Sequence, residues 1–547
     1  MTARKYFLFV YLLGLLLMGL GYLAILPVFE GFDENAHYSS MRQIADIGTI
    51  PIYDKSYLDQ ETIDYQGPLA YGSGMPPFDR NMVYSKFFTN PELVEYYRQA
   101  YRQSLTRSPY RASQVSNWQA QHPPLYYLLL ASLVSVSNHF SLVTQFFLLR
   151  MVSFILALAG VAFGLLAFRQ PSLPPAADPA MIGFVLYPVI LPMFYPEFTR
   201  LGNDSLCLFL VALVAYLLSL WLKDEHNTKI SIAIGIVLGM GLLTKAFFIP
   251  ITASFVMFLL IRLWWDKNNV EMRFQRGCNL LQIILPALLI GGGWYVYKLL
   301  IYGELTGSDL AIQLARQGGL MTGLKENFSF YALGRGIAGP LVSYSWAGTW
   351  SLTRMPVLLH LPLLLITAWV TGAFLLQLKN KPLTDPIWLT AWICGVFGCL
   401  IFCYVVINIA LSAHGNTPGW YFHILIPWIA PALGIGAVSI LKHRRAKLFL
   451  IGFIFYAVLF QIIALWAQLS LFTGCATKGD DKYYVFSGKA FCLDQASLLI
   501  DRLAVLGYPN LAAIGFGGGL VCMLFLLTLV LKNKYYIHGD EYRTHNT

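Results

Sequence analysis

The hydrophobic residues of this chain are gathered into long runs that alternate with polar stretches. A helix that crosses a membrane needs about 20 consecutive, mostly apolar residues. Runs close to that length lie near residues 6–27, 142–168, 181–198, 204–222, 230–245, 246–264, 280–302, 355–377, 387–411, 420–441, 448–472 and 511–531. The pattern therefore predicts an all-α polytopic membrane protein with about twelve transmembrane helices.

A further apolar segment, 123–136 ("PPLYYLLLASLVSV"), is too short for a full crossing. If it lies along the membrane surface, the basic clusters between the spans all fall on one side, as the positive-inside rule requires of the cytoplasm. Those clusters are Arg4 and Lys5, Lys223 and Lys229, Arg262 to Arg276, Lys379 and Lys381, Lys442 to Lys447, and Lys532 and Lys534. If the segment crosses, the later clusters face outwards. We therefore expect a juxtamembrane helix here and both termini in the cytoplasm.

The composition agrees with a membrane protein and narrows the classes of function. Of the 547 residues, 57% are hydrophobic and 12% are charged, and the formal net charge is +10. A soluble domain is about a quarter charged. Excess Lys and Arg in a polytopic membrane protein sets its orientation, so the positive charge does not indicate a nucleic-acid partner.

This topology makes residues 1–547 a single transmembrane domain with three long polar loops on the outer face, at about 28–141, 303–354 and 473–510. Long loops are commonly functional, so we expect any chemistry at the outer surface. Cys475 and Cys492 share the last of these loops, and a disulfide between them agrees with an oxidising outer compartment.

The stretch "EGFDENAHYSS" directly follows the first apolar run and carries Asp33, Glu34 and His37. At helical spacing Asp33 and His37 are four residues apart and Glu34 and His37 three, so the three side chains are expected to converge. Such a group can deprotonate an alcohol or hold a cation. The alternative is a solvated helix start, where acidic residues favour the first turn.

Four motifs in order give the chain a family resemblance. They are "FDENAHY" after the first span, "QHPPLYYLLLA" before the second, "TRLGNDSL" at the fourth and "GLLTKAFF" at the end of the fifth. In these motifs the chain resembles GT-C membrane glycosyltransferases, in the bacterial branch that includes lipid A aminoarabinose transferases and protein O-mannosyltransferase-like enzymes. The resemblance covers residues 1 to 265 well and the remainder in topology.

The resemblance implies a GT-C fold in a bacterial inner membrane and a polyprenyl-phosphate sugar, such as an undecaprenyl-phosphate sugar, as donor. The acceptor would be a lipid, glycan or protein on the periplasmic side. The acidic residue after the first span is the proposed base of the family, which maps to Asp33 with Glu34 beside it. A leaving phosphate needs cations, and the candidates are Lys245, Arg200, Arg150 and Arg354. Lys245 can also be a snorkelling anchor, and Arg200 can simply pair with Asp204.

Further residues are candidates for binding the acceptor or the sugar: His37, His122, Asp204, Trp346, Trp350 and Tyr421. An interfacial Trp belt gives the same pattern as a sugar-stacking site. In relatives an arginine often precedes the tyrosine in "GWYFHILIP", whereas this chain has Trp420. The departure puts one donor-phosphate contact in question.

The resemblance therefore predicts an inverting glycosyltransferase, and no cofactor is assigned. Whether a divalent metal ion binds stays open; Asp33, Glu34, Asp204 and His37 would be its oxygen and nitrogen ligands. An oligosaccharide ligase or oligosaccharyltransferase that uses a pyrophosphate-linked donor is an alternative on the same fold. A secondary transporter is the other alternative, although its matched halves and mid-membrane charges are not seen in the sequence.

Overall fold

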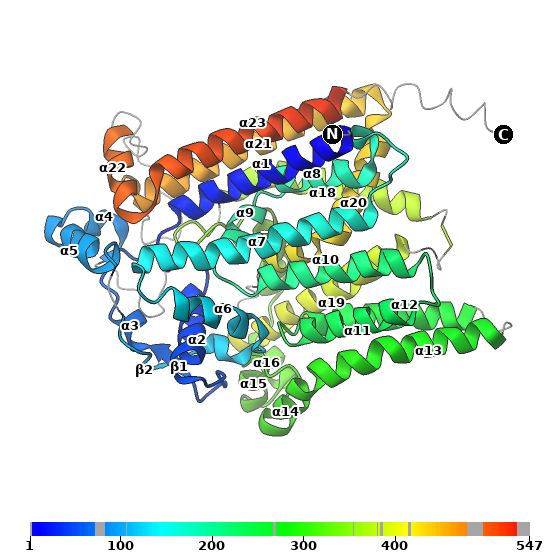
Figure 1. Ribbon diagram of the computed structural model, residues 1–547, viewed down its shortest axis with the longest axis horizontal. Coiled ribbons are helices and arrows are strands. Elements are labelled where there is room, and N and C mark those ends of the chain that lie inside the picture. The colour runs from blue at the N-terminus through cyan, green and yellow to red at the C-terminus, as the bar shows by residue number, and fades with distance from the viewer. Residues whose placement is uncertain are drawn as a thin grey trace.

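The computed structural model describes residues 3–71, 82–104, 107–265, 270–353, 355–379, 381–382, 385, 387–413, 417–477 and 496–532. Within them the chain is mainly helical (Figure 1). The helices are α1 (Ala3–Ile25), α2 (Glu34–Ile47), α3 (Gln60–Ile63), α4 (Tyr84–Phe87), α5 (Pro91–Tyr101), α6 (Leu125–Val136), α7 (Leu142–Phe168), α8 (Pro179–Ile190), α9 (Phe194–Thr199), α10 (Asp204–Trp221), α11 (Thr228–Leu242), α12 (Phe248–Trp265), α13 (Val270–Ala287), α14 (Gly293–Tyr302), α15 (Asp309–Arg316), α16 (Leu320–Asn327), α17 (Phe330–Ser345), α18 (Val357–Leu378), α19 (Ile387–Ser412), α20 (Ile426–Leu441), α21 (Arg444–Phe472), α22 (Ala496–Leu506) and α23 (Pro509–Lys532). The strands are β1 (Tyr57–Asp59) and β2 (Ala112–Ser116). Short 3₁₀ turns lie at Trp118–Gln121, Pro175–Ala177 and Trp420–Leu425, and a π-helical turn lies at Leu288–Gly292.

Ten helices in the described part are long and apolar enough to cross a membrane, which confirms the all-α polytopic class. They are α1, α7, α10, α12, α13 with α14, α18, α19, the 3₁₀ turn with α20, α21 and α23. The predicted run 181–198 is instead divided into α8 and α9, of 12 and 6 residues, and the run 230–245 forms α11, of 15 residues. Helix α8 stops early because Leu191 precedes Pro192 and leaves the helical region of backbone conformation, with ψ 72°.

The first and last spans lie against each other in antiparallel directions (Figure 1). A Cβ placed on Gly515 would lie 2.5 Å from the Gly21 nitrogen, so only glycine permits this close approach of the two backbones. The contact ends where the Tyr508 N–H donates to the Ala24 carbonyl at 2.9 Å. The start of α1 and the end of α23 therefore lie at the same end of the bundle.

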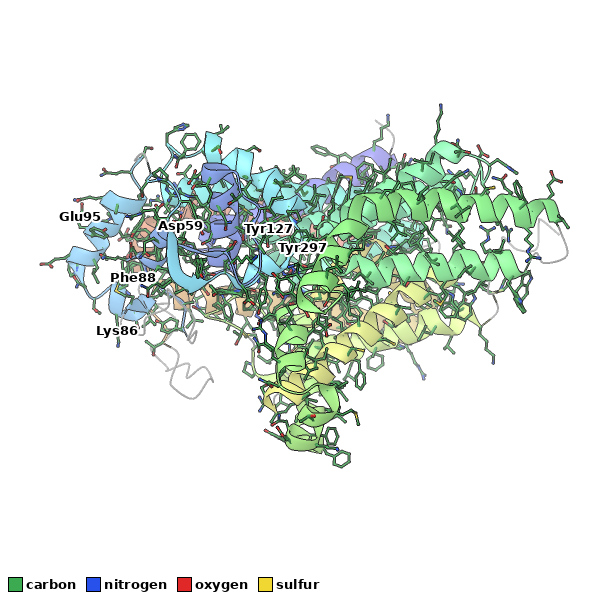
Figure 2. The ribbon with its side chains drawn as sticks, turned by 90° about the horizontal axis from the view of Figure 1, so that it is seen from below. Asp59, Lys86, Phe88, Glu95, Tyr127 and Tyr297 are labelled. Carbon is green, nitrogen blue, oxygen red and sulfur yellow. The ribbon has the colours of Figure 1, made fainter. Side chains whose placement is uncertain are left out.

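The segment between α1 and α7 covers the opposite end of the bundle. In Figure 2 its elements lie together, with Asp59 and Glu95 labelled on them. Strand β1 pairs antiparallel with β2 in a two-stranded sheet in which Tyr57 faces Ser116. Buried Arg42 of α2 ties this sheet to the helix through Asp59 at 3.3 Å. Helix α6 has 12 residues and is too short to cross, as the sequence predicts.

The ends of the helices separate the acidic stretch from the basic turns. The start of α1, the end of α12 and the start of α13 lie at one end in Figure 1, while α2, α5 and α22 lie at the other. The direction in which this bundle sits in a membrane stays a prediction. Cys475 is disulfide-bonded. Cys492 and Arg354 lie outside the described residues, so the predicted Cys475–Cys492 bond and the phosphate-binding role of Arg354 stay predictions.

Candidate functional site

The residue directly before α2, Asp33, has an unusual backbone conformation. Its φ of 61° lies in the left-handed region, which few residues other than Gly adopt. Although Asp33 is the N-cap residue of α2, its side chain makes no capping hydrogen bond. Its Oδ1 instead accepts a hydrogen bond from the Trp118 indole at 3.0 Å. The backbone therefore turns this carboxylate away from its own helix, and such strain is commonly found at functional sites.

Asp33 is half-buried, whereas the residues on either side of it, Phe32 and Glu34, are buried. Burial raises the pKa of the Asp33 carboxyl, against the lowering effects of the Trp118 hydrogen bond and the charges of Arg200 and Lys245. A carboxylate held by one neutral donor keeps three of its lone-pair positions for another partner. Asp33 is thus the carboxylate of this stretch that can accept a proton from a ligand.

The Glu34 carboxylate, by contrast, accepts its hydrogen bonds from donors inside the protein. Its Oε1 accepts from Arg150 Nε at 2.8 Å and from the Leu201 N–H at 2.8 Å. Its Oε2 accepts from Arg150 Nη2 at 2.5 Å and from the Gly31 N–H at 3.1 Å. Arg150 also donates to the carbonyls of Leu26 and Pro27, at 2.6 and 2.7 Å.

The expected convergence of Asp33, Glu34 and His37 is therefore wrong for Glu34. Neighbouring residues at a helix start point in different directions, so Asp33 and Glu34 do not face one another. Glu34 and Arg150 fasten the end of α1 to α2 and α7. Each carboxylate oxygen of Glu34 accepts two hydrogen bonds from donors within the protein. The placement favours a structural role for both residues.

The fourth-span motif and the fifth-span lysine form one buried chain of charges. Arg200 donates to both oxygens of Glu197, at 3.1 and 2.6 Å, and to the Phe32 carbonyl at 3.0 Å. It also reaches Asp204 at 3.3 Å. Lys245 Nζ lies 2.8 and 3.0 Å from the two oxygens of Asp204.

Each cation of this chain of charges faces a carboxylate, Arg200 facing Glu197 and Lys245 facing Asp204. Lys245 is 5% exposed and does not snorkel to the surface. Its ammonium lies over the rings of Phe247 and Tyr421, at 4.5 and 4.8 Å from their centroids. Of the two alternatives for Arg200, the pairing with Asp204 is present, and the contact with a donor phosphate stays a prediction. Arg200 also holds the backbone before Asp33.

Two histidines complete the polar surroundings, and both are kept neutral. His37 Nδ1 lies 2.9 Å from the Tyr127 hydroxyl of α6. Burial lowers the pKa of His37 well below its usual value. Burial also lowers the pKa of His122 to about 3, with a further contribution from Lys245. Both rings are therefore neutral near pH 7.

The aromatic candidates divide into two groups. Trp346 is fully buried in the main core and packs on Phe460, which favours a structural role. Trp350 packs edge-on against Phe32 at 4.9 Å. Trp420 stands at the position where the resemblance implies an arginine. Its ring stacks on the Phe32 ring, with the centroids 4.8 Å apart and the planes 3° from parallel. An aromatic cluster thus adjoins the residue before Asp33.

Some residues of this region were not found from the sequence. Trp118, Tyr127 and Glu197 make direct contacts with predicted residues. For Glu197 a signal existed, since an acidic residue inside an apolar run and three positions before Arg200 demands a partner. Trp118 and Tyr127 had none, because their proximity depends on how α6 docks on α2.

Glu30 was also missed and is the other buried carboxylate of the segment. It accepts hydrogen bonds from the hydroxyls of Tyr84 and Thr349, at 2.7 and 2.6 Å, and from the backbone and side chain of Ser351. Burial raises the pKa of Glu30 to about 7. These contacts fasten the 346–353 loop beside Asp33.

Among the described residues, no group of three or more His, Cys, Asp and Glu side chains is placed to hold a metal ion. The oxygen and nitrogen set considered from the sequence is dispersed, because Glu34 faces Arg150 and Asp204 faces Lys245. Of the acidic residues in this set, Asp33 makes no ion pair among the described residues, and its Oδ1 accepts from the neutral Trp118 indole.

No protein-family model matches the chain, and no curated protein matches its sequence. Two chains of solved structures match its fold. One is ArnT from Cupriavidus metallidurans bound to undecaprenyl phosphate, at 14% identity and a TM-score of 0.46, over 98% of this chain and 78% of that chain.

Proposed function

We propose that this chain is an inverting glycosyltransferase of a bacterial inner membrane that moves one sugar from a polyprenyl-phosphate carrier to an acceptor on the periplasmic side. The observation that carries the proposal is Asp33, a half-buried carboxylate in a left-handed conformation with a neutral hydrogen-bond donor. The sequence motifs supply the reaction class. Both termini would be cytoplasmic, and the acidic stretch would face the periplasm.

In the proposed reaction Asp33 is the general base. The acceptor oxygen attacks the anomeric carbon as its proton passes to the Asp33 carboxylate. The bond between the anomeric carbon and the phosphate oxygen breaks, and the carrier phosphate leaves with the electron pair. A positioned base contributes about a hundred- to ten-thousandfold to the rate. The raised pKa of Asp33 suits this role, because a stronger base takes the proton more readily.

The neighbouring groups position this base. The Trp118 indole donates to Asp33 Oδ1 and holds the carboxylate in place. Arg200 donates to the carbonyl of Phe32 and so fixes the backbone that turns Asp33 outwards. Lys245 and Arg200, which pair with Asp204 and Glu197, stabilise charge that develops on the leaving phosphate.

The test is sugar transfer from polyprenyl-phosphate donors in membranes that contain the wild type or Asp33→Asn. We expect a loss of at least a hundredfold in turnover at equal expression. Asp64→Asn is the matched control, since Asp64 is an exposed carboxylate of the same loop, and we expect wild-type turnover from it. The acid limb of the wild-type pH profile should lie above the ordinary pKa of Asp, because burial raises the pKa of Asp33.

Equal turnover in the wild type and Asp33→Asn would show that Asp33 is not the base. Turnover with a pyrophosphate-linked glycan and none with a single-sugar donor would show that the donor class is wrong and would favour the oligosaccharide ligase on the same fold. Absence of turnover with both donor classes would refute the transferase.

A further inference from the structure

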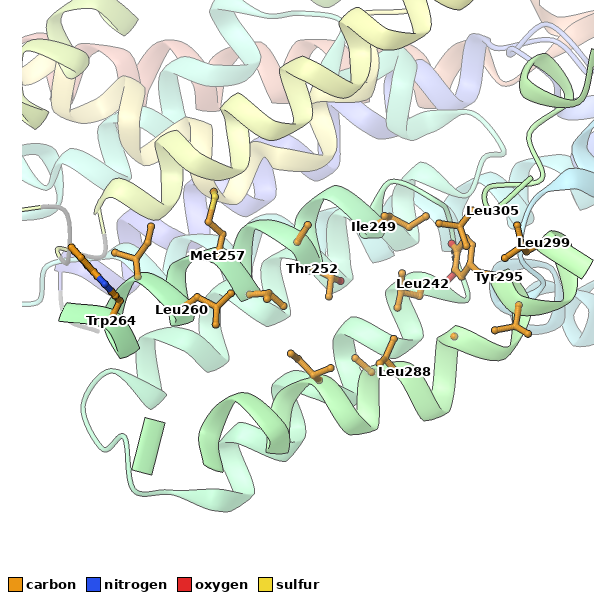
Figure 3. A pocket seen from close by; sticks show the side chains of 17 residues that line it. Leu242, Ile249, Thr252, Met257, Leu260, Trp264, Leu288, Tyr295, Leu299 and Leu305 are labelled. Atoms are coloured by element: carbon orange, nitrogen blue, oxygen red, sulfur yellow. Dashed lines mark hydrogen bonds between the residues drawn. The ribbon is translucent and has the colours of Figure 1, made fainter. Parts of the chain in front are cut away.

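A cavity of about 290 Å³ lies between the spanning helices, away from the candidate site. Its walls come from α7, α8, α10, α18, α19, α20 and the residues that adjoin them. It shares no lining residue with the larger groove of about 840 Å³ between α12 and α13 with α14, which has Met257 on one side and Leu288 on the other (Figure 3). The cavity and the groove are therefore separate.

The helix ends that line the cavity show where it lies. Phe168 is the last residue of α7, Pro179 is the first residue of α8, and Leu222 directly follows α10. Arg4, near the start of α1, donates to the carbonyl of the lining residue Gln170 at 2.8 Å. One end of the cavity thus lies at the chain-start end of the bundle, whereas the acidic stretch follows the other end of α1.

From this end the cavity reaches into the apolar part of the bundle. A Cβ on Gly434 would lie 1.7 Å from the Pro179 carbonyl oxygen, so Ile435 of the lining is level with the start of α8. The α20 residues that line the cavity extend from Ile435 back to Trp428, about 10 Å along the helix axis. That length is about two-thirds of the hydrocarbon thickness of one leaflet, which is half of roughly 30 Å.

Small side chains leave this space open. The alanines of the lining are Ala167, Ala180, Ala215 and Ala432. Protein interiors are normally packed with few voids larger than a water molecule. A space of this size between spanning helices therefore calls for an occupant when the protein is in a membrane.

The chemistry of the lining favours hydrocarbon over water as that occupant. A buried water typically makes two to four hydrogen bonds. The polar side chains of the lining are Gln170, Ser219, Thr390 and the Trp428 indole, and the other lining side chains are hydrocarbon. The Ser219 hydroxyl already donates to the Tyr216 carbonyl at 2.7 Å. The walls offer too few partners for a group of water molecules and suit an acyl chain.

Two exposed cations flank the chain-start end of the cavity. Arg169 lies between two lining residues, and Lys223 directly follows a third. Neither forms an ion pair within the part of the chain that the structure describes. The neighbouring carboxylates have other partners, because Asp178 pairs with Arg4 at 3.1 Å and Asp224 accepts from a backbone N–H at 3.3 Å. The flank therefore favours an anion.

We propose that the cavity holds one acyl chain of an anionic glycerophospholipid from the leaflet at the chain-start end, and that Arg169 and Lys223 bind the phosphate of its head group. Basic pockets between spanning helices bind anionic lipid head groups. The apolar walls, the depth within one leaflet and the two cations match the three parts of such a lipid. The lipid is a bound component at the end of the bundle opposite Asp33, so this proposal does not depend on the transfer reaction.

The test measures lipid binding by the purified full chain in detergent. The protein is titrated with phosphatidylglycerol, with phosphatidylethanolamine of the same acyl chains, and with glycerol 3-phosphate, which has the charge without the chains. Bound lipid is counted by native mass spectrometry. Two cations at a membrane surface contribute on the order of thirtyfold to the affinity for an anionic lipid. We expect phosphatidylglycerol to bind at least tenfold more tightly than phosphatidylethanolamine, and glycerol 3-phosphate not to bind.

The charge variants test the head group. The double variant Arg169→Gln with Lys223→Gln is expected to bind the two phospholipids alike. Lys532→Gln is the matched control, because Lys532 is an exposed cation at the end of α23, a helix that contributes no lining residue. It should keep the wild-type preference.

The alanine variants test the place of the acyl chain. Ala432→Leu fills part of the cavity and is expected to weaken the binding of phosphatidylglycerol about tenfold or more. Ala432→Val, with a smaller side chain, should give an intermediate loss, which a misfolded protein would not show. Ala253→Leu is the matched control, since Ala253 lines the larger groove of Figure 3 and not the cavity. It should bind phosphatidylglycerol as the wild type does.

Thermal stability gives a second readout. A ligand that binds the folded state raises the apparent Tm, so phosphatidylglycerol should raise the Tm of the wild type and not that of the double charge variant. Equal binding of the two phospholipids by the wild type would overturn the anionic lipid as occupant. A preference that persists in the double charge variant would overturn the assignment of the phosphate. Full binding by Ala432→Leu, or loss of binding in Ala253→Leu alone, would overturn the cavity as the place of the acyl chain.

Discussion

The buried pair of Glu34 and Arg150 provides a direct test of which carboxylates in this region are structural. Arg150→Met removes two hydrogen bonds to Glu34 and those to the carbonyls of Leu26 and Pro27. It also leaves the Glu34 charge buried, where both side chains are at most 2% exposed. Removing one partner of a buried ion pair costs about 3–5 kcal/mol.

That free energy is measurable as a change in melting temperature. An unfolding entropy of roughly 2.1 cal/mol/K per residue converts it to a fall of about 3–4 °C in apparent Tm for a chain of 547 residues. The double variant Glu34→Met with Arg150→Met removes both charges. Because apolar replacement of a buried pair is often nearly neutral, we expect the double variant to lose less than the two single variants together.

The assay is thermal unfolding of the purified protein in detergent, followed by intrinsic fluorescence, with sugar transfer measured well below the Tm. Arg98→Met is the matched control, since Arg98 pairs with Glu95 at 3.6 Å where both side chains are more than half exposed. Such a surface pair contributes about 0–1 kcal/mol. We expect Glu34→Gln to lower the Tm and to reduce turnover by no more than about tenfold. That loss of turnover is smaller than the loss typical of a general base.

Three results would refute this reasoning. One is an Arg150→Met protein with the wild-type Tm. Another is strict additivity of the two single variants. The third is a Glu34→Gln protein with the wild-type Tm and a hundredfold loss of turnover, which would make Glu34 catalytic.

Two further predictions concern Glu30 and the orientation. Burial raises the pKa of Glu30 from 4.5 to about 7. Between those pH values the folded state therefore holds a proton that the unfolded state has lost. The contribution of Glu30 to stability falls as the pH rises from about 4.5 to 7, and it is constant above pH 7. The loss is on the order of 3 kcal/mol; Glu30→Gln should flatten the dependence of Tm on pH, and an unchanged slope would contradict the buried charge. Lys55→Cys and Lys223→Cys should react with a membrane-impermeant maleimide from opposite sides of the membrane, above the wild-type background; labelling from one side would contradict the orientation.

The sequence by itself determined the class of the fold and the position of the proposed base. Apolar runs of about 20 residues can hardly be anything but spanning helices, because the backbone must satisfy its own hydrogen bonds in lipid. The location of Asp33 directly after the first run was also visible in the sequence. Its charge at a membrane boundary needs an explanation that a solvent-exposed aspartate does not.

What the tertiary structure decided is the partner of each charge. Asp33 and Glu34 are adjacent in the chain, yet one has a neutral indole donor and the other a buried arginine 116 residues away. Lys245 and Lys298 look alike as lysines near helix ends, but the first pairs with Asp204 and the second makes no ion pair within the described residues. Those differences follow from how distant helices pack, and local sequence patterns carry information over a few helical turns at most.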